Sequence, residues 1–256
     1  MPFDPRDFWA FLLVFSRVTA LVATAPVFSS AAIPRTVKVG LAGLVSLATV
    51  PVVFPHVPTP PGDLFSLAGQ IGAEAAIGAL LGFLANMVFA AVQIAGTVVD
   101  TQIGFAIIHV LNPYTGQPTA AIGQFYYQFA LTLFLLADGH ASLIGSVVGS
   151  FGVVGPGAAH FAGDVPGVLI DMMGQMFLLG FRIAVPAAAV LLVVDVSFAI
   201  VARAVPQMNV FIVGLPAKVI IGLITLSVGL PALALVLGQI LPMIDTGLRA
   251  ALSASR

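Results

Sequence analysis

The chain has 256 residues, of which only 7% are charged, nine basic and ten acidic, so that the formal net charge is −1. Soluble domains carry about 25% charged residues. Here 60% of the residues are hydrophobic and the mean hydropathy is +1.14. These values exclude a soluble enzyme, a disordered chain and a protein that binds nucleic acid through a basic face. The sequence therefore predicts an integral membrane protein.

Apolar stretches that approach or exceed the roughly 20 residues needed to cross a bilayer recur along the chain. The first covers about 8–28 and ends near Pro26, and we expect it to remain as the first helix because its start is acidic. The second covers about 38–56. The third covers about 69–99 and has Glu74 near its start.

Three further stretches follow, and each contains residues that interrupt helices. The fourth covers about 122–152, with a break predicted at 138–140. The fifth covers about 167–202 and is predicted to be broken by Pro186. The sixth covers about 210–245 and also contains prolines, at Pro216 and Pro231.

Continuous apolar runs argue against a β-barrel, whose strands alternate over about ten residues. The predicted fold is therefore all-α: a polytopic membrane protein of about six hydrophobic helical segments with Pro and Gly breaks. The positive-inside rule gives nearly a tie for its orientation. On a six-span arrangement one side has Arg35, Lys38 and Arg203, and the other has Arg6, Arg249 and Arg256. We infer that these helices do not all end as conventional spans.

Signals for catalysis are absent from the sequence. Cysteine does not occur, which excludes a disulfide, a thiolate metal site and a cysteine nucleophile. No histidine has a second ligand at metal-binding spacing, and no HExxH, GxSxG or Walker motif occurs. We expect no metal, no cofactor and no enzymatic activity. The isolated histidines are interpreted as residues of loops or helix ends: His56, His109, His140 and His160.

Charged residues inside or beside the apolar segments form the second signal. A charge at the centre of a bilayer costs about 2.5–3.5 kcal/mol, so such residues should face protein, water or a headgroup. Acids and bases are nearly equal in number and dispersed, which favours structural pairing over an ion or proton pathway. The candidates for buried charges are Arg17, Glu74, Asp100, Arg182, Asp195 and Lys218.

Small residues at helical spacing form the third signal. Gly78-x-x-x-Gly82 and Gly145-x-x-x-Gly149 both lie on predicted helices. Such smooth faces let helix backbones approach closely, either within one chain or between subunits. The spacing leaves both possibilities open.

A polar segment separates two apolar runs in the middle of the chain. Its Pro and Gly residues disfavour a helix, and its side chains can hydrogen-bond to water or to each other. At membrane depth such a backbone is tolerated only inside protein or along a water-filled cavity, whereas outside the membrane it is an ordinary turn. The segment consists of Asn112, Pro113, Tyr114, Thr115, Gly116, Gln117, Pro118 and Thr119.

Two stretches contain residue patterns that are more specific than an apolar composition. One begins with Ala25-Pro26-Val27-Phe28 and continues through Pro34 to Lys38 and Gly40. The other is 205–216, with Pro206, Gln207, Asn209, Gly214 and Pro216. Together with Gln102-Ile103-Gly104-Phe105, Asn112-Pro113 and Gly139-His140, they resemble the flagellar biosynthetic protein FliR family. This is the R-type subunit of the type III secretion export gate, called T-type in virulence systems, and the resemblance spans nearly the whole chain.

The resemblance implies a single subunit in a hetero-oligomer with P-type and Q-type gate subunits. Residues 1–175 would be similar to a P-type subunit, and 176–256 to the helical hairpin of a Q-type subunit. Further implied partners are the B-type switch and A-type export subunits, unfolded export substrates and inner-membrane lipids, but no nucleic acid. The implied place is the flagellar basal body in the bacterial inner membrane, where 112–119 would plug a pore.

Other functions remain open on the residues alone. A self-sufficient secondary transporter or ion channel would need a mid-membrane binding site, for which the candidates are Glu74, Asp100, Arg182 and Asp195. The equivalent subunit of a virulence system would have a similar sequence. An intramembrane enzyme and a pure assembly scaffold are the remaining alternatives, and the enzyme lacks every motif expected for one.

Overall fold

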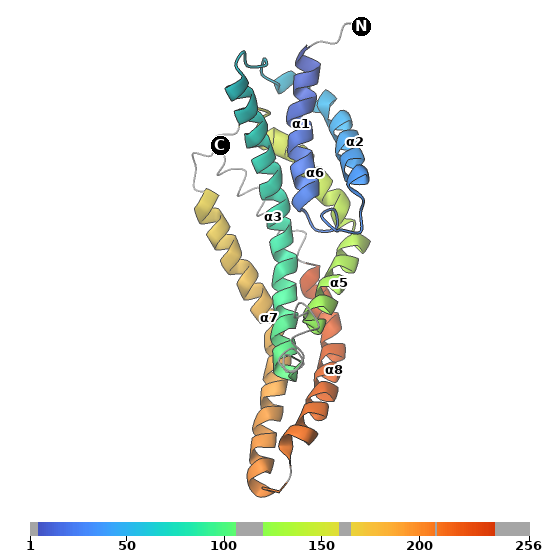
Figure 1. Ribbon diagram of the computed structural model, residues 1–256, viewed down its shortest axis with the longest axis vertical. Helices are drawn as coiled ribbons and strands as arrows, with labels where there is room; N and C mark the ends of the chain where they lie inside the picture. The colour runs from blue at the N-terminus through green and yellow to red at the C-terminus, as the bar shows by residue number, and fades with distance from the viewer. Residues whose placement is uncertain (1–4, 106–119, 159–164, 208, 239–256) are drawn as a thin grey trace. The chain divides into compact units, whose positions relative to one another are not determined.

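The computed structural model describes residues 5–105, 120–158, 165–207 and 209–238. The elements in these ranges are helices: α1 (Pro5–Thr24), α2 (Arg35–Val53), a 3₁₀ turn (Phe54–His56), α3 (Leu64–Ile103), α5 (Ala121–Leu136), α6 (Gly139–Val153), α7 (Val165–Ala204) and α8 (Val210–Leu237). Figure 1 shows them from blue α1 to red α8. Within the described ranges, five helices are long and apolar enough to cross a membrane, and α5 with α6 forms a sixth, bent candidate. The predicted all-α membrane fold is confirmed.

The helix starts follow from local chemistry. Pro5 opens α1, where its missing N–H is not needed. Asp63 precedes α3 and accepts a hydrogen bond of 2.8 Å from the backbone N–H of Ser66. Asn209 precedes α8, and its Oδ1 accepts from the N–H groups of Phe211 and Ile212 at 3.1 and 3.4 Å. These caps satisfy donors that the helix itself leaves free.

The predicted break in the fourth segment is confirmed. Asp138 adopts the left-handed conformation, with φ of 54°, between the end of α5 and the start of α6. The two helices are bent by 70° at this point. A residue in this conformation cannot continue a right-handed helix, so the chain turns here.

The predicted break at Pro186 is wrong. Both α7 and α8 continue through their internal prolines, Pro186 in the first and Pro216 and Pro231 in the second. A proline removes one helical hydrogen bond. In an apolar environment, however, leaving the helix exposes several backbone groups without water to satisfy them. Continuing the helix is therefore the less costly solution.

The chain forms two compact units. Of the described residues, the first unit contains 5–88, 134–158 and 165–173, and the second contains 89–105, 120–133, 174–207 and 209–238. In the first unit α1 packs beside α2 and, through Gly78 and Gly82, against α3. A Cβ on Gly78 would lie 2.0 Å from the carbonyl oxygen of Arg17, so only glycine permits this approach.

The second unit has its own close contacts. The backbones of α3 and α5 meet where Gly96 lies against Gly123, since a Cβ on Gly96 would lie 2.6 Å from the Cα of Gly123. On α7, Gly180 lies against the backbone of Ala91 in the same way. Elsewhere α7 and α8 keep most of their large apolar side chains exposed. Surfaces of this kind suit contact with lipid or with other protein chains.

Candidate functional site

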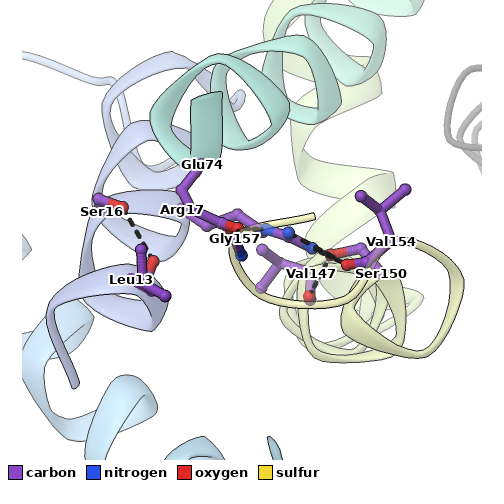
Figure 2. A network of polar contacts seen from close by, with 8 residues as sticks. All are labelled: Leu13, Ser16, Arg17, Glu74, Val147, Ser150, Val154 and Gly157. Carbon is purple, nitrogen blue, oxygen red and sulfur yellow. Dashed lines mark hydrogen bonds and ion pairs between the residues drawn. The ribbon is translucent and has the colours of Figure 1, made fainter. Parts of the chain in front are cut away.

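The first unit contains a buried ion pair between two of the charges that the sequence singles out. Arg17 of α1 donates from Nε to the Oε2 atom of Glu74 on α3, at 2.6 Å. Both side chains have no exposed surface. Figure 2 shows the guanidinium between Glu74 on one side and the end of α6 on the other.

The remaining donors of the guanidinium bind α6 and the turn that follows it. Arg17 Nη1 donates to Ser150 Oγ at 2.9 Å, and both terminal nitrogens donate to the carbonyl oxygen of Val154 at 3.2 Å. The ring of Phe151 covers the guanidinium carbon at 3.9 Å. The second carboxylate oxygen of Glu74 accepts from the N–H of Gly157 at 2.8 Å.

This network, which we call the Arg17 cluster (Arg17, Glu74, Ser150, Phe151, Val154 and Gly157), joins α1, α3 and α6. Buried ions are stable only when both partners and their remaining hydrogen-bonding atoms are satisfied, as they are here. Because neither ion has exposed surface, neither can exchange an ion or proton directly with water. The geometry is that of a structural network that holds three helices together.

A second charge, Asp100 of α3, is 3% exposed and binds the start of α5 in the second unit. Its carboxylate oxygens accept hydrogen bonds of 3.0 to 3.1 Å from the backbone N–H groups of Ile122 and Gly123. Asp100 thereby acts as an N-terminal cap supplied by another helix, where the helix dipole also favours a negative charge. Asp100 thus connects the end of α3, which precedes residues 106–119, to the start of α5, which follows them.

A third polar site joins three elements of the second unit. Lys218 of α8 forms an ion pair with Asp195 of α7, and its Nζ donates to the carbonyl oxygen of Gln102 at 3.2 Å. The pair is partly exposed and borders a cavity of about 280 Å³ whose walls include Phe198 and Phe211. Lys218 therefore ties the end of α3 to the α7–α8 hairpin.

Arg182 differs from the other five charges. It lies on α7 and its side chain is exposed on this chain, although the sequence groups it with the buried charges. It forms no hydrogen bond or ion pair with any residue that the structure describes.

The residues of the family resemblance lie near the connection between α1 and α2 and near the connection between α7 and α8. Pro26 is buried, and its carbonyl accepts from the N–H of Phe28 at 2.9 Å, in a tight turn that gives Val27 a φ of 70°. Gly214 is buried and lines the cavity. Lys38 is half-buried, and the exposed members are Pro34, Gly40, Pro206, Gln207, Asn209 and Pro216. The predicted plug, Asn112 to Thr119, lies outside the described residues.

Sequence reasoning missed the partners that α6 contributes. Ser150 is a polar residue in an apolar helix, which is a signal for a buried hydrogen bond. The carbonyl of Val154 and the N–H of Gly157 carry no signal, because every residue has these groups. Among the described residues, no group of three His, Asp or Glu side chains could hold a metal ion.

Long apolar helices with internally paired charges define this chain as an all-α polytopic membrane protein. Residues 8–243 match the family of bacterial export proteins, family 1. The chain belongs to this family, since the match covers most of its length.

Individual relatives agree with this assignment. The chain is 37% identical over 226 residues to flagellar biosynthetic protein FliR of Bacillus subtilis (strain 168), covering 86% of each chain. It is 32% identical over 226 residues to the protein of that name from Pectobacterium carotovorum, covering 88% of this chain and 84% of the relative. It is also 30% identical over 160 residues to Yop proteins translocation protein T of Yersinia pestis, covering 61% of this chain and 60% of the relative.

Proposed function

We propose that this chain is a non-enzymatic subunit of the flagellar export apparatus, and that it helps form and plug the inner-membrane pore through which unfolded flagellar proteins leave the cell. The observation that carries the proposal is the family match over residues 8–243, together with the FliR relatives. The long apolar helices support a place in the membrane.

The flagellar system is favoured over a virulence system. The Bacillus FliR protein aligns with 86% of this chain, whereas the Yersinia translocation protein aligns with 61%. A self-sufficient transporter is less well supported. Of its four candidate charges, Glu74 and Asp195 form ion pairs within the chain, and Asp100 caps a helix.

We expect the partners to be the P-type and Q-type gate subunits, with the B-type switch and A-type export subunits nearby. The proposed likeness of 1–175 to a P-type subunit and of 176–256 to a Q-type hairpin places the division inside α7. A single long helix would then connect the two parts.

We assign the plug to residues 112–119. Their flanks support the assignment, because the Asp100 cap and the contact of Gly96 with Gly123 hold α3 and α5 together on either side of this segment. Deleting 113–118 should make membranes that contain the assembled apparatus leaky to small ions. Unchanged ion conductance in an assembled deletion variant would remove the plug assignment.

The function is tested by deleting the gene in its native bacterium and supplying it again on a plasmid. The deletion should abolish swimming and retain hook and filament proteins inside the cell, and the plasmid should restore both. Normal export in the deletion strain would contradict the proposal.

A native mass of the protein, solubilised from its own membrane in mild detergent, separates subunit from self-sufficient transporter. A particle well above the 26.3 kDa chain, with two other small membrane subunits in excess, supports the proposal. A stable particle of this chain alone, or a homodimer, would favour the transporter.

A further inference from the structure

One charge in the apolar helices has no partner among the residues that the structure describes. Among the described residues, Arg17 pairs with Glu74, Lys218 pairs with Asp195, and Asp100 receives backbone N–H groups. Arg182 has no such partner. Of the predicted set of six, it is the member that the described part of the chain leaves without a partner.

The surroundings of Arg182 are apolar. One turn away on the same face of α7 are Leu178 and Val185, which are 58% and 52% exposed, and the adjacent Phe181 is 50% exposed. Pro186 follows four residues later and has no N–H, so the carbonyl of Arg182 also loses its usual helical donor. Donors and an acceptor are therefore both available at one point of an apolar surface.

This apolar face is longer than the hydrocarbon layer of a bilayer. Large exposed apolar residues of α7 extend from Ile170 to Ile200, about 45 Å of helix at a rise of roughly 1.5 Å per residue. A tilt of about 40° would shorten this to about 35 Å. The hydrocarbon layer is only about 30 Å thick. The apolar face therefore extends beyond the hydrocarbon layer, which favours a protein cover over part of it.

The position of Arg182 along α7 decides whether it can lie outside the hydrocarbon layer of a bilayer. It lies about 18 Å from Ile170 and about 27 Å from Ile200 along the helix axis. Wherever a layer of about 30 Å falls along this length, Arg182 lies inside it. If α7 instead lies outside the membrane, the whole apolar face needs a protein cover. In both cases the guanidinium lies on an apolar face, and no described residue of this chain supplies its counter-ion.

We propose that the α7 face centred on Arg182 binds an apolar helix of a neighbouring export-apparatus subunit, and that a carboxylate on this helix pairs with the Arg182 guanidinium. The inference rests on the proposed function, which places the chain among other membrane subunits. Among protein side chains, a carboxylate is the acceptor that a planar guanidinium binds with two parallel hydrogen bonds. The exposed side chains of Leu178 and Val185 are suited to pack against an apolar helix.

The test uses the tagged full-length chain in its native membrane, with a photo-crosslinking amino acid at Val185 and Arg182 unchanged. We expect protein adducts at this position, formed with another apparatus subunit. Because no charge is altered, this measurement does not depend on a variant that might fail to assemble.

Charge variants then test the ion pair. Arg182→Lys should retain the co-purifying subunits, and Arg182→Glu should reduce their yield by about tenfold or more, since two like charges would meet. Arg182→Leu provides the uncharged comparison and should also reduce the yield. Arg203→Glu is the matched control, because Arg203 is exposed on the same helix but lies in its last turn, and it should leave the yield unchanged. Replacing the acid of the crosslinked subunit by Arg should rescue Arg182→Glu.

The failures are distinguishable. If the wild-type chain assembles but Arg182→Glu assembles equally well and Val185 yields only lipid adducts, the inference is overturned and the proposed function stands. Adducts between two copies of this chain would also overturn it. If the wild-type chain purifies without any other subunit, the proposed function itself fails.

Discussion

The Arg17 cluster sets the strongest expectation for a single residue. Arg17→Met would leave Glu74 buried without its counter-ion, which costs about 3–5 kcal/mol of folding free energy. The double variant Arg17→Met with Glu74→Leu should lose less than Arg17→Met alone, because no unpaired charge remains. Thermal unfolding of the solubilised protein measures both, with exposed Arg35→Met as the control. If the double variant lost as much stability as the sum of the losses in Arg17→Met and Glu74→Leu alone, this explanation would be contradicted.

Asp63 predicts a pH dependence at the start of α3. The hydrogen bond from the Ser66 N–H lowers the pKa of the Asp63 carboxyl, because it favours the charged form. A lowered pKa stabilises the folded state above the unfolded value of about 3.9, and this contribution is lost as pH falls through the folded value. Hydrogen exchange of the Ser66 amide, corrected for intrinsic rates, should therefore accelerate in that acidic window.

The Asp63 variants separate the charge from the cap. Asp63→Asn keeps an oxygen acceptor without a titrating group, so protection of the Ser66 amide should become independent of pH in the same window. Asp63→Ala should lose protection at every pH. If Asp63→Asn retained the full acid-induced loss, another group would be responsible.

At the scale of helices, two glycine pairs of identical spacing predict opposite effects. Gly78→Ala would place a Cβ against the α1 backbone, so we expect a loss of about 1–3 kcal/mol from overpacking. Gly145→Ala meets nothing within 4 Å and lies inside α6, so it should stabilise the protein by roughly 0.5–1 kcal/mol. Denaturation midpoints of the two variants in one detergent provide the comparison. Equal shifts would show that spacing alone governs both positions.

The helices are also where the sequence was most and least informative. Long apolar runs predicted the long helices that the structure describes, and the Asp138-Gly139 pair predicted the bend between α5 and α6. The prediction at Pro186 was wrong. A rule based on local propensity counts the one hydrogen bond that a proline removes, but it ignores that no water is present in an apolar environment to satisfy an unwound backbone. Sequence rules for proline hold best where water can satisfy the freed carbonyl.

The charge pairs belong to the whole molecule, and no local rule could predict them. Arg17 and Glu74 are separated by 57 residues, and Lys218 reaches a carbonyl 116 residues away. Near equality of acids and bases indicates that pairs exist, but which residues meet depends on how distant helices pack. The acceptors on the backbone, such as the carbonyls of Val154 and Gln102, have no identity in the sequence at all.

The same separation has a consequence for biosynthesis. A ribosome that adds about 5–20 residues per second produces Glu74 about 3–11 s after Arg17, and Ser150 only later, 133 residues after Arg17. During this interval α1 carries a cation without its counter-ion. Nascent chains stalled before Glu74 should therefore keep a cysteine at position 16 open to water-soluble thiol reagents, and chains extended past Gly157 should protect it. If this cysteine were already protected in the short chains, α1 would be shielded from water before its partners are synthesised. If protection appeared only in the longer chains, the packing of α6 would be the step that buries α1.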